Sequence, residues 1–169
     1  MSKAMPDRSN VQTIPISFTL NGKLEEIDVE PRDLLLDVVR NRFGLTGAKR
    51  SCDMQVCGAC TVLIDGGPVS ACTTLAFEVR GRSVVTIEGL ADNGKLHPLQ
   101  QAFIRYGGFQ CGFCTPGMIL ASKALLDENP NPTDAELKHF MRGNICRCTG
   151  YKKIMDSIKA AAKQMRGSG

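Results

Sequence analysis

Tryptophan is absent from this chain of 169 residues, and the other aromatic residues are scarce, with seven phenylalanines and two tyrosines. Any hydrophobic core must therefore be built mainly from aliphatic side chains. No apolar run reaches the length that spans a bilayer, so we expect no membrane segment. The length suits one ordinary domain or two small ones, and the apolar fraction of 43% is ordinary for a globular protein.

The first residues lack the apolar segment of a secretory signal, and they hold no twin-arginine pair. We expect residues 1–13 to form a disordered or extended N-terminal arm. The missing signal predicts a cytoplasmic, reducing compartment, where disulfides are rare. The eight cysteines are also too sparse for a disulfide scaffold. The sequence therefore predicts that these cysteines bind metal as thiolates.

Positive charge is in modest excess, with 21 lysines and arginines against 17 aspartates and glutamates. These cations are scattered and are not interleaved with aromatic residues, which argues against nucleic-acid binding. Bound anionic metal centres would largely offset the formal charge of +4. No glycine-rich phosphate loop lies between a strand and a helix, so we expect no nucleotide site on this chain.

Residues 14–88 combine strand and helix patterns. Two alternating segments flank Asn21-Gly22, which predicts a β-hairpin with a tight turn. Residues 31–43 carry apolar side chains at helical spacing before Gly44, a typical helix end. Further strands are expected at residues 61–64, 68–72 and 83–87. This pattern predicts an α+β domain in which a helix lies across a small mixed sheet.

Residues 89–94 form a linker in this interpretation, and residues 95–165 then follow a helical pattern. The four expected helices begin at Pro98, after Thr115, at the capping box that starts at Thr133, and after Thr149. Four helices with short connections predict a four-helix bundle, with residues 166–169 as a tail. The lone histidines, His97 and His139, are expected at a helix cap or on the surface.

The first set of cysteines lies in the α+β segment. Cys52, Cys57 and Cys60 have the spacing Cys-x4-Cys-x2-Cys, and Cys72 follows after eleven more residues. This is the order of ligands in a plant-type [2Fe–2S] site. Soluble plant ferredoxins usually place the fourth cysteine further along the chain, so this site is a variant.

The second set lies in the helical segment, as Cys111-x2-Cys114 and Cys146-x-Cys148. We expect Thr115 and Thr149 to cap two helices directly after these cysteines. Both helix N-termini would then face one anionic centre, which their dipoles favour.

Structural zinc is the main alternative for either set, because zinc also binds four thiolates. Its usual pattern is two Cys-x2-Cys pairs separated by a modest loop. Here those pairs lie more than fifty residues apart, and each has two further cysteines of its own. A redox-active dithiol of Cys57 and Cys60 would leave Cys52 and Cys72 unexplained. Four protein ligands per site favour electron transfer over catalysis at the metal.

The cysteine-containing stretches resemble the iron–sulfur subunit of molybdenum hydroxylases, the superfamily of xanthine dehydrogenase, aldehyde oxidase and carbon monoxide dehydrogenase. The resemblance covers residues 14–165, and its most specific stretches lie around the second set. One departure is Gln55, where the family often has glycine. The matching stretches are Gly44-Leu-Thr-Gly-Ala-Lys49, Cys57-Gly-Ala-Cys-Thr-Val62, Gln110-Cys-Gly-Phe-Cys-Thr-Pro-Gly-Met118 and Arg142-Gly-Asn-Ile-Cys-Arg-Cys-Thr-Gly-Tyr151.

The resemblance implies a β-grasp ferredoxin-like domain followed by a four-helix bundle, each holding one [2Fe–2S] cluster. It implies electron flow from a molybdopterin centre through the bundle cluster and the ferredoxin-like cluster to FAD. Molybdopterin and FAD would lie on a large and a medium partner subunit, in a dimer of heterotrimers, and Gln110 and Cys148 would lie against the pterin. No substrate is converted on this chain in that interpretation. The rival interpretation is a free-standing two-cluster ferredoxin.

Overall fold

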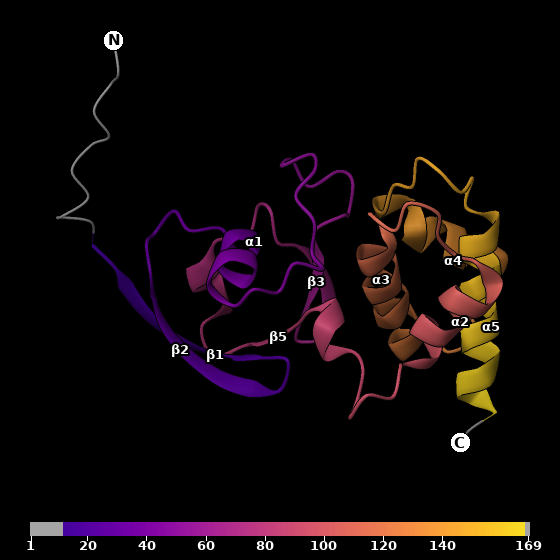
Figure 1. Ribbon diagram of the computed structural model, residues 1–169, viewed down its shortest axis with the longest axis horizontal. Coiled ribbons are helices and arrows are strands. Elements are labelled where there is room, and N and C mark those ends of the chain that lie inside the picture. The colour runs from indigo at the N-terminus through magenta and orange to yellow at the C-terminus, as the bar shows by residue number, and fades with distance from the viewer. Residues whose placement is uncertain (1–11, 168–169) are drawn as a thin grey trace, which may run out of the picture.

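A computed structural model describes residues 12–167. The predicted arm at residues 1–13 and the end of the predicted tail therefore lie almost wholly outside the described residues. Within residues 12–167 no helix is long and apolar enough to cross a bilayer. The described residues form a mixed sheet followed by a helical half, so the predicted α+β class is confirmed (Figure 1).

The N-terminal hairpin forms as its alternating pattern predicts. Strands β1 (Ile14–Leu20) and β2 (Lys23–Val29) pair antiparallel, and Asn21-Gly22 makes the turn with positive φ at both residues. The hairpin belongs to a five-stranded sheet of order β2-β1-β5-β3-β4. Strand β5 (Ser83–Val85) runs parallel to β1, and β3 (Thr61–Ile64) runs antiparallel to both β5 and β4 (Gly67–Ser70).

Two strands are shorter than the sequence predicts. Strand β4 ends at Ser70, so Cys72 lies in a turn and not on the strand. Strand β5 ends at Val85, and a 3-10 turn, η3 (Ile87–Gly89), follows it. A second 3-10 turn, η2 (Ala76–Val79), leads from the Cys72 turn towards β5.

The helix expected at residues 31–43 forms only in part. It consists of one α-helical turn, α1 (Leu35–Asp37), which continues as a π-helical turn, η1 (Val38–Arg42). Leu35 and Leu36 are fully buried beneath it against the sheet, together with Phe18 of β1. Gly44 follows at φ +67°, a left-handed conformation that ends the helix as predicted.

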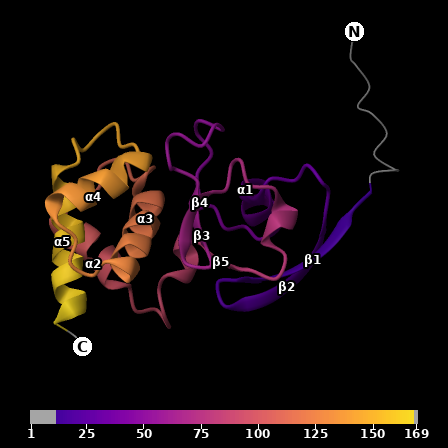
Figure 2. The ribbon, with the colours of Figure 1, turned by 180° about the vertical axis from the view of Figure 1, so that it is seen from behind.

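The second half consists of four α-helices and a 3-10 turn among the described residues: α2 (Pro98–Tyr106), α3 (Thr115–Glu128), α4 (Asp134–Phe140), η4 (Met141–Gly143) and α5 (Lys152–Arg166). Helix α3 lies between the sheet and the other helices, and it contacts β3 and β4 on one side (Figures 1 and 2). Its side chains are therefore buried along most of its length. The whole half packs around one hydrophobic cluster that also includes Leu63 of β3.

The helix caps confirm two predictions and correct two others. The His97 ring Nδ1 accepts the Leu99 amide at 3.2 Å at the start of α2, and Thr133 forms the predicted capping box of α4. Thr115 is not a cap, because Cys114 already has helical backbone angles and takes the cap position. Thr149 is not a cap either, because α5 begins three residues later.

The backbone of α3 packs closely against the backbone of the first cysteine loop. A Cβ atom built on Gly117 of α3 would lie 2.2 Å from the Gly58 carbonyl oxygen, which belongs to the first cysteine loop. Only glycine therefore allows α3 to pack this closely against that loop.

We expect Gly117→Ala to destabilise the protein. The clash with a backbone carbonyl costs about 1–3 kcal/mol, which outweighs the gain of about 1 kcal/mol from alanine's helix propensity. Urea unfolding measures the change. Gly143→Ala is the matched control because its Cβ would meet open space, and it should change stability by less than about 0.5 kcal/mol. Equal stability of the two variants would contradict the tight contact.

Candidate metal centres

The first set of thiols forms two pairs at the edge of the sheet. The Cys57 amide donates to the Cys52 sulfur at 3.4 Å, and the side chains of these two cysteines also interact. Cys60 and Cys72 form the other pair, and both are almost completely buried. The sequence predicted this set of four, and the structure arranges them as two pairs, Cys52 with Cys57 and Cys60 with Cys72.

Two thiols of this set, Cys52 and Cys60, differ in how easily they ionise. Amide hydrogen bonds from Met54, Cys57 and Val56, together with the Cys57 thiol, lower the pKa of Cys52 to about 6. Burial raises the pKa of Cys60 to about 11, and the neighbouring Cys72 thiol adds to this effect. A thiol must lose its proton to bind metal, so Cys60 depends on a positive metal core to ionise it.

The second set also forms two pairs, at the N-terminus of α3. The sulfur atoms of Cys111 and Cys148 lie 3.6 Å apart and are exposed at the surface. Cys114 and Cys146 lie deeper and hydrogen-bond to each other. Burial, followed by the Cys146 thiol, raises the pKa of Cys114 to about 12.

Thr149 interacts directly with one sulfur of this set, although it caps no helix. Its hydroxyl donates to the Cys146 sulfur at 3.0 Å, and its amide lies 3.4 Å from the same atom. Burial alone would raise the pKa of Cys146, but these two hydrogen bonds, together with those from the Cys148 amide and the Cys114 thiol, outweigh it and lower the pKa. Thr149 therefore stabilises the thiolate form of this cysteine.

The arrangement fits two [2Fe–2S] clusters better than single metal ions. Between residues 12 and 167, no three histidine, cysteine, aspartate or glutamate side chains converge closely enough to share one ion. The thiols meet two by two instead, and a [2Fe–2S] cluster takes four cysteines, two on each iron. The buried Thr115 hydroxyl, next to Cys114, has no partner within the described residues and is available to donate to a cluster sulfur.

One segment connects the two sites. The Ile145 amide donates to the Cys57 carbonyl at 2.9 Å, so backbone beside a second-set cysteine bonds to a first-set cysteine. The buried Asn144 amide group donates to the Gly58 carbonyl at 3.0 Å and reaches the Thr61 hydroxyl at 3.3 Å. Both cysteine loops consequently lie at the same edge of the molecule, beside the start of α3 (Figures 1 and 2). Nothing in the cysteine spacing indicated this role for Asn144.

Comparison with known proteins agrees with both sites. Residues 18–84 match the 2Fe-2S iron-sulfur cluster binding domain, and residues 86–159 match the [2Fe-2S] binding domain. The chain is 49% identical over 151 residues to the nicotinate dehydrogenase small FeS subunit of Eubacterium barkeri, covering 89% of this chain and 96% of that protein. It is 45% identical over 152 residues to the nicotine 6-hydroxylase small subunit of Paenarthrobacter nicotinovorans, covering 90% and 92%.

The fold is shared with a chain in the crystal structure of quinoline 2-oxidoreductase from Pseudomonas putida 86. The TM-score is 0.88 and the identity 47%, and the match covers 92% of this chain and 98% of that chain. This chain belongs to the iron–sulfur subunits of the molybdenum hydroxylases. Subunits of this family are parts of multisubunit oxidoreductases and have no substrate site of their own, while molybdopterin and FAD lie on other subunits.

Gln55, where the resemblance led us to expect glycine, has an unusual backbone conformation. Gln55 has φ +61°, a left-handed conformation in which glycine is unstrained and other residues are not. The loop curls around the thiols through this residue, Asp53 at φ +52° and Gly58 at φ +68°. The Gln55 side-chain oxygen accepts a long hydrogen bond from the Thr73 hydroxyl at 3.3 Å. A residue with a Cβ atom is therefore strained at this position of the loop.

We expect Gln55→Gly to be more stable than Gln55→Ala by about 1 kcal/mol, because a left-handed conformation costs a residue with a Cβ atom roughly 1–2 kcal/mol. Both variants lose the hydrogen bond to Thr73, so their difference isolates the backbone strain. Chemical unfolding of the two proteins measures it. A glycine variant no more stable than the alanine variant would show that the strain at this position is negligible.

Proposed function

We propose that this chain is the electron-transfer subunit of a molybdenum hydroxylase. It takes electrons from a molybdopterin centre on one partner subunit and delivers them to FAD on another. The observation that carries the proposal is the arrangement of eight free thiols as four pairs, in two sites joined by the hydrogen bond from Ile145 to Cys57. The alternative, a free-standing ferredoxin-type carrier, is less well supported because the relatives are subunits of larger enzymes.

The pairs indicate which thiols would share an iron. In the first site these are Cys52 with Cys57 and Cys60 with Cys72. In the second site they are Cys111 with Cys148 and Cys114 with Cys146. When bound, each [2Fe–2S] cluster supplies one-electron chemistry, which divides a two-electron oxidation into single steps. The protein keeps one pair of each site shielded from water and presents the other near the surface.

We propose that the exposed pair of the second site, Cys111 and Cys148, lies at the edge that faces the pterin. Gln110 is exposed beside Cys111, and Cys148 is exposed opposite it. Three large apolar side chains are also exposed around this edge, Phe109 (42%), Phe113 (45%) and Ile145 (47%). Exposed apolar side chains near the exposed thiols in the sequence suit a surface that binds another protein. These features support contact of Gln110 and Cys148 with the molybdopterin of a large subunit.

We extend the proposal to the organisation of the chain. Residues 14–88 would form a β-grasp domain and residues 95–165 a four-helix bundle of α2 to α5, with a linker at 89–94. The two separate hydrophobic clusters support this division. We also propose assembly with a large molybdopterin subunit and a medium FAD subunit as a dimer of heterotrimers in the cytoplasm. Eight free thiols suit that reducing compartment.

We expect the purified protein to contain about four iron atoms and about four acid-labile sulfides per chain, with two distinct EPR signals after reduction. Cys72→Ser should lose the first signal and keep the second, and Cys148→Ser should do the reverse, because each variant removes one of four thiolate ligands. Metal analysis and EPR measure both effects. Stoichiometric zinc, or one signal at full iron loading, would refute the proposed function.

A further inference from the structure

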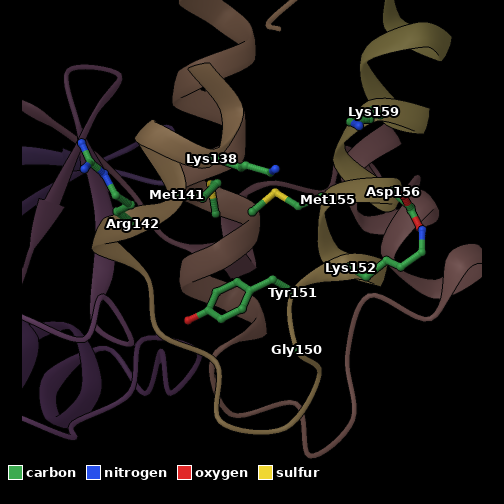
Figure 3. A pocket seen from close by; sticks show the side chains of 9 residues that line it. All are labelled: Lys138, Met141, Arg142, Gly150, Tyr151, Lys152, Met155, Asp156 and Lys159. Carbon is green, nitrogen blue, oxygen red and sulfur yellow. The ribbon is translucent and has the colours of Figure 1, made fainter. Parts of the chain in front are cut away.

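Tyr151 has an unusual conformation beside the second cysteine set. Gly150 and Tyr151 have φ of +64° and +69°, and Tyr151 occupies the cap position of α5. Aromatic residues are rarely held in this left-handed region, and such strain persists where the surrounding structure enforces it. The Tyr151 ring packs against the helical core and lines a groove of about 570 Å³, together with Met141, Met155 and Lys138 (Figure 3).

The hydroxyl of Tyr151 points away from those side chains. It is directed towards the chain segment that follows Arg142 (Figure 3). There it accepts the Cys146 amide at 2.9 Å and lies 3.5 Å from the Asn144 carbonyl, to which it donates its own proton. The strained cap therefore places one hydroxyl between two backbone groups of the segment that connects the sites.

This hydroxyl is the acceptor of the Cys146 amide. The Cys146 sulfur already receives hydrogen bonds from the hydroxyl and the amide of Thr149. Hydrogen bonds to the sulfur atoms of an iron–sulfur site help to set its reduction potential. They favour the reduced form because it is the more negatively charged. Because the Cys146 amide donates to Tyr151, it does not donate to a sulfur atom. It therefore does not raise the reduction potential of the second centre.

We propose that Tyr151 is a positioning residue that keeps the reduction potential of the second centre low, by holding the Cys146 amide away from sulfur. The proposal deepens the proposed function and rests on it. A lower potential at this centre would favour onward transfer of each electron to the first centre. The effect belongs to the hydroxyl, because the ring alone would fill the same space.

The test is the reduction potential of each EPR signal in the purified full chain, with the partners it retains, comparing Tyr151→Phe with the wild type. Without the hydroxyl, the buried Cys146 amide needs another acceptor, and sulfur is the acceptor that the proposal expects. The potential of the second signal should therefore rise while the first stays unchanged. Tyr106→Phe is the matched control, because Tyr106 is the other tyrosine of the chain and is exposed.

A second arm keeps the proposal testable if Tyr151→Phe loses the second centre. In the Tyr106→Phe background, Tyr151 is the only tyrosine left in this chain, so growth on 3-fluorotyrosine weakens that one hydroxyl as an acceptor and keeps the ring, provided that the potential is measured at about pH 6, where this phenol stays protonated. The second potential should again rise. An unchanged or lower second potential, with iron content intact, would overturn the proposal. A wild-type protein without two signals would instead overturn the proposed function, and this proposal with it.

Discussion

The hydrogen bond from the Ile145 amide to the Cys57 carbonyl is the interaction on which the rest of the arrangement depends. It joins two loops that are almost ninety residues apart in the sequence, and each loop carries cysteines of a different site. Asn144 reinforces the contact by donating to the Gly58 carbonyl, and Gly117 lets α3 approach that Gly58 carbonyl closely. Because backbone groups make the contact, the separation of the two sites is fixed by the fold and not by flexible side chains.

Each site has one pair of thiols that lies deeper than the other, and burial and hydrogen bonds shift the pKa values of individual thiols in both sites. In the first site, amide donors lower the pKa of Cys52, while burial raises that of Cys60. In the second site, burial raises the pKa of the half-buried Cys114, hydrogen bonds lower that of the buried Cys146, and Cys111 and Cys148 lie at the surface. A bound cluster would therefore have one shielded and one accessible end, which suits electron transfer across a protein surface. Hydrogen bonds to the sulfur atoms can then adjust the reduction potential of each centre.

The N-terminal hairpin and the two sets of cysteines could be predicted from the sequence, because they depend on local signals. Alternation around Asn21-Gly22 predicted the hairpin, and cysteine spacing predicted both sets of thiols. The pairing of those thiols and the role of Asn144 depend on contacts between distant segments, which spacing does not reveal. Thr149 was predicted to cap α5, but the left-handed turn at Tyr151 delays the helix and leaves the Thr149 hydroxyl on the Cys146 sulfur. A tyrosine gives no sequence signal for that conformation.

The measurement that tests this account most directly is EPR of the protein at partial and at full reduction. If the hydrogen-bonded Asn144–Cys146 segment holds the two centres close together, reducing both should place two unpaired spins near each other. We predict that the two signals broaden or split at full reduction and not at partial reduction. Two signals that simply add, with unchanged line shape and relaxation at full reduction, would contradict the claim that the backbone holds the sites together for electron transfer.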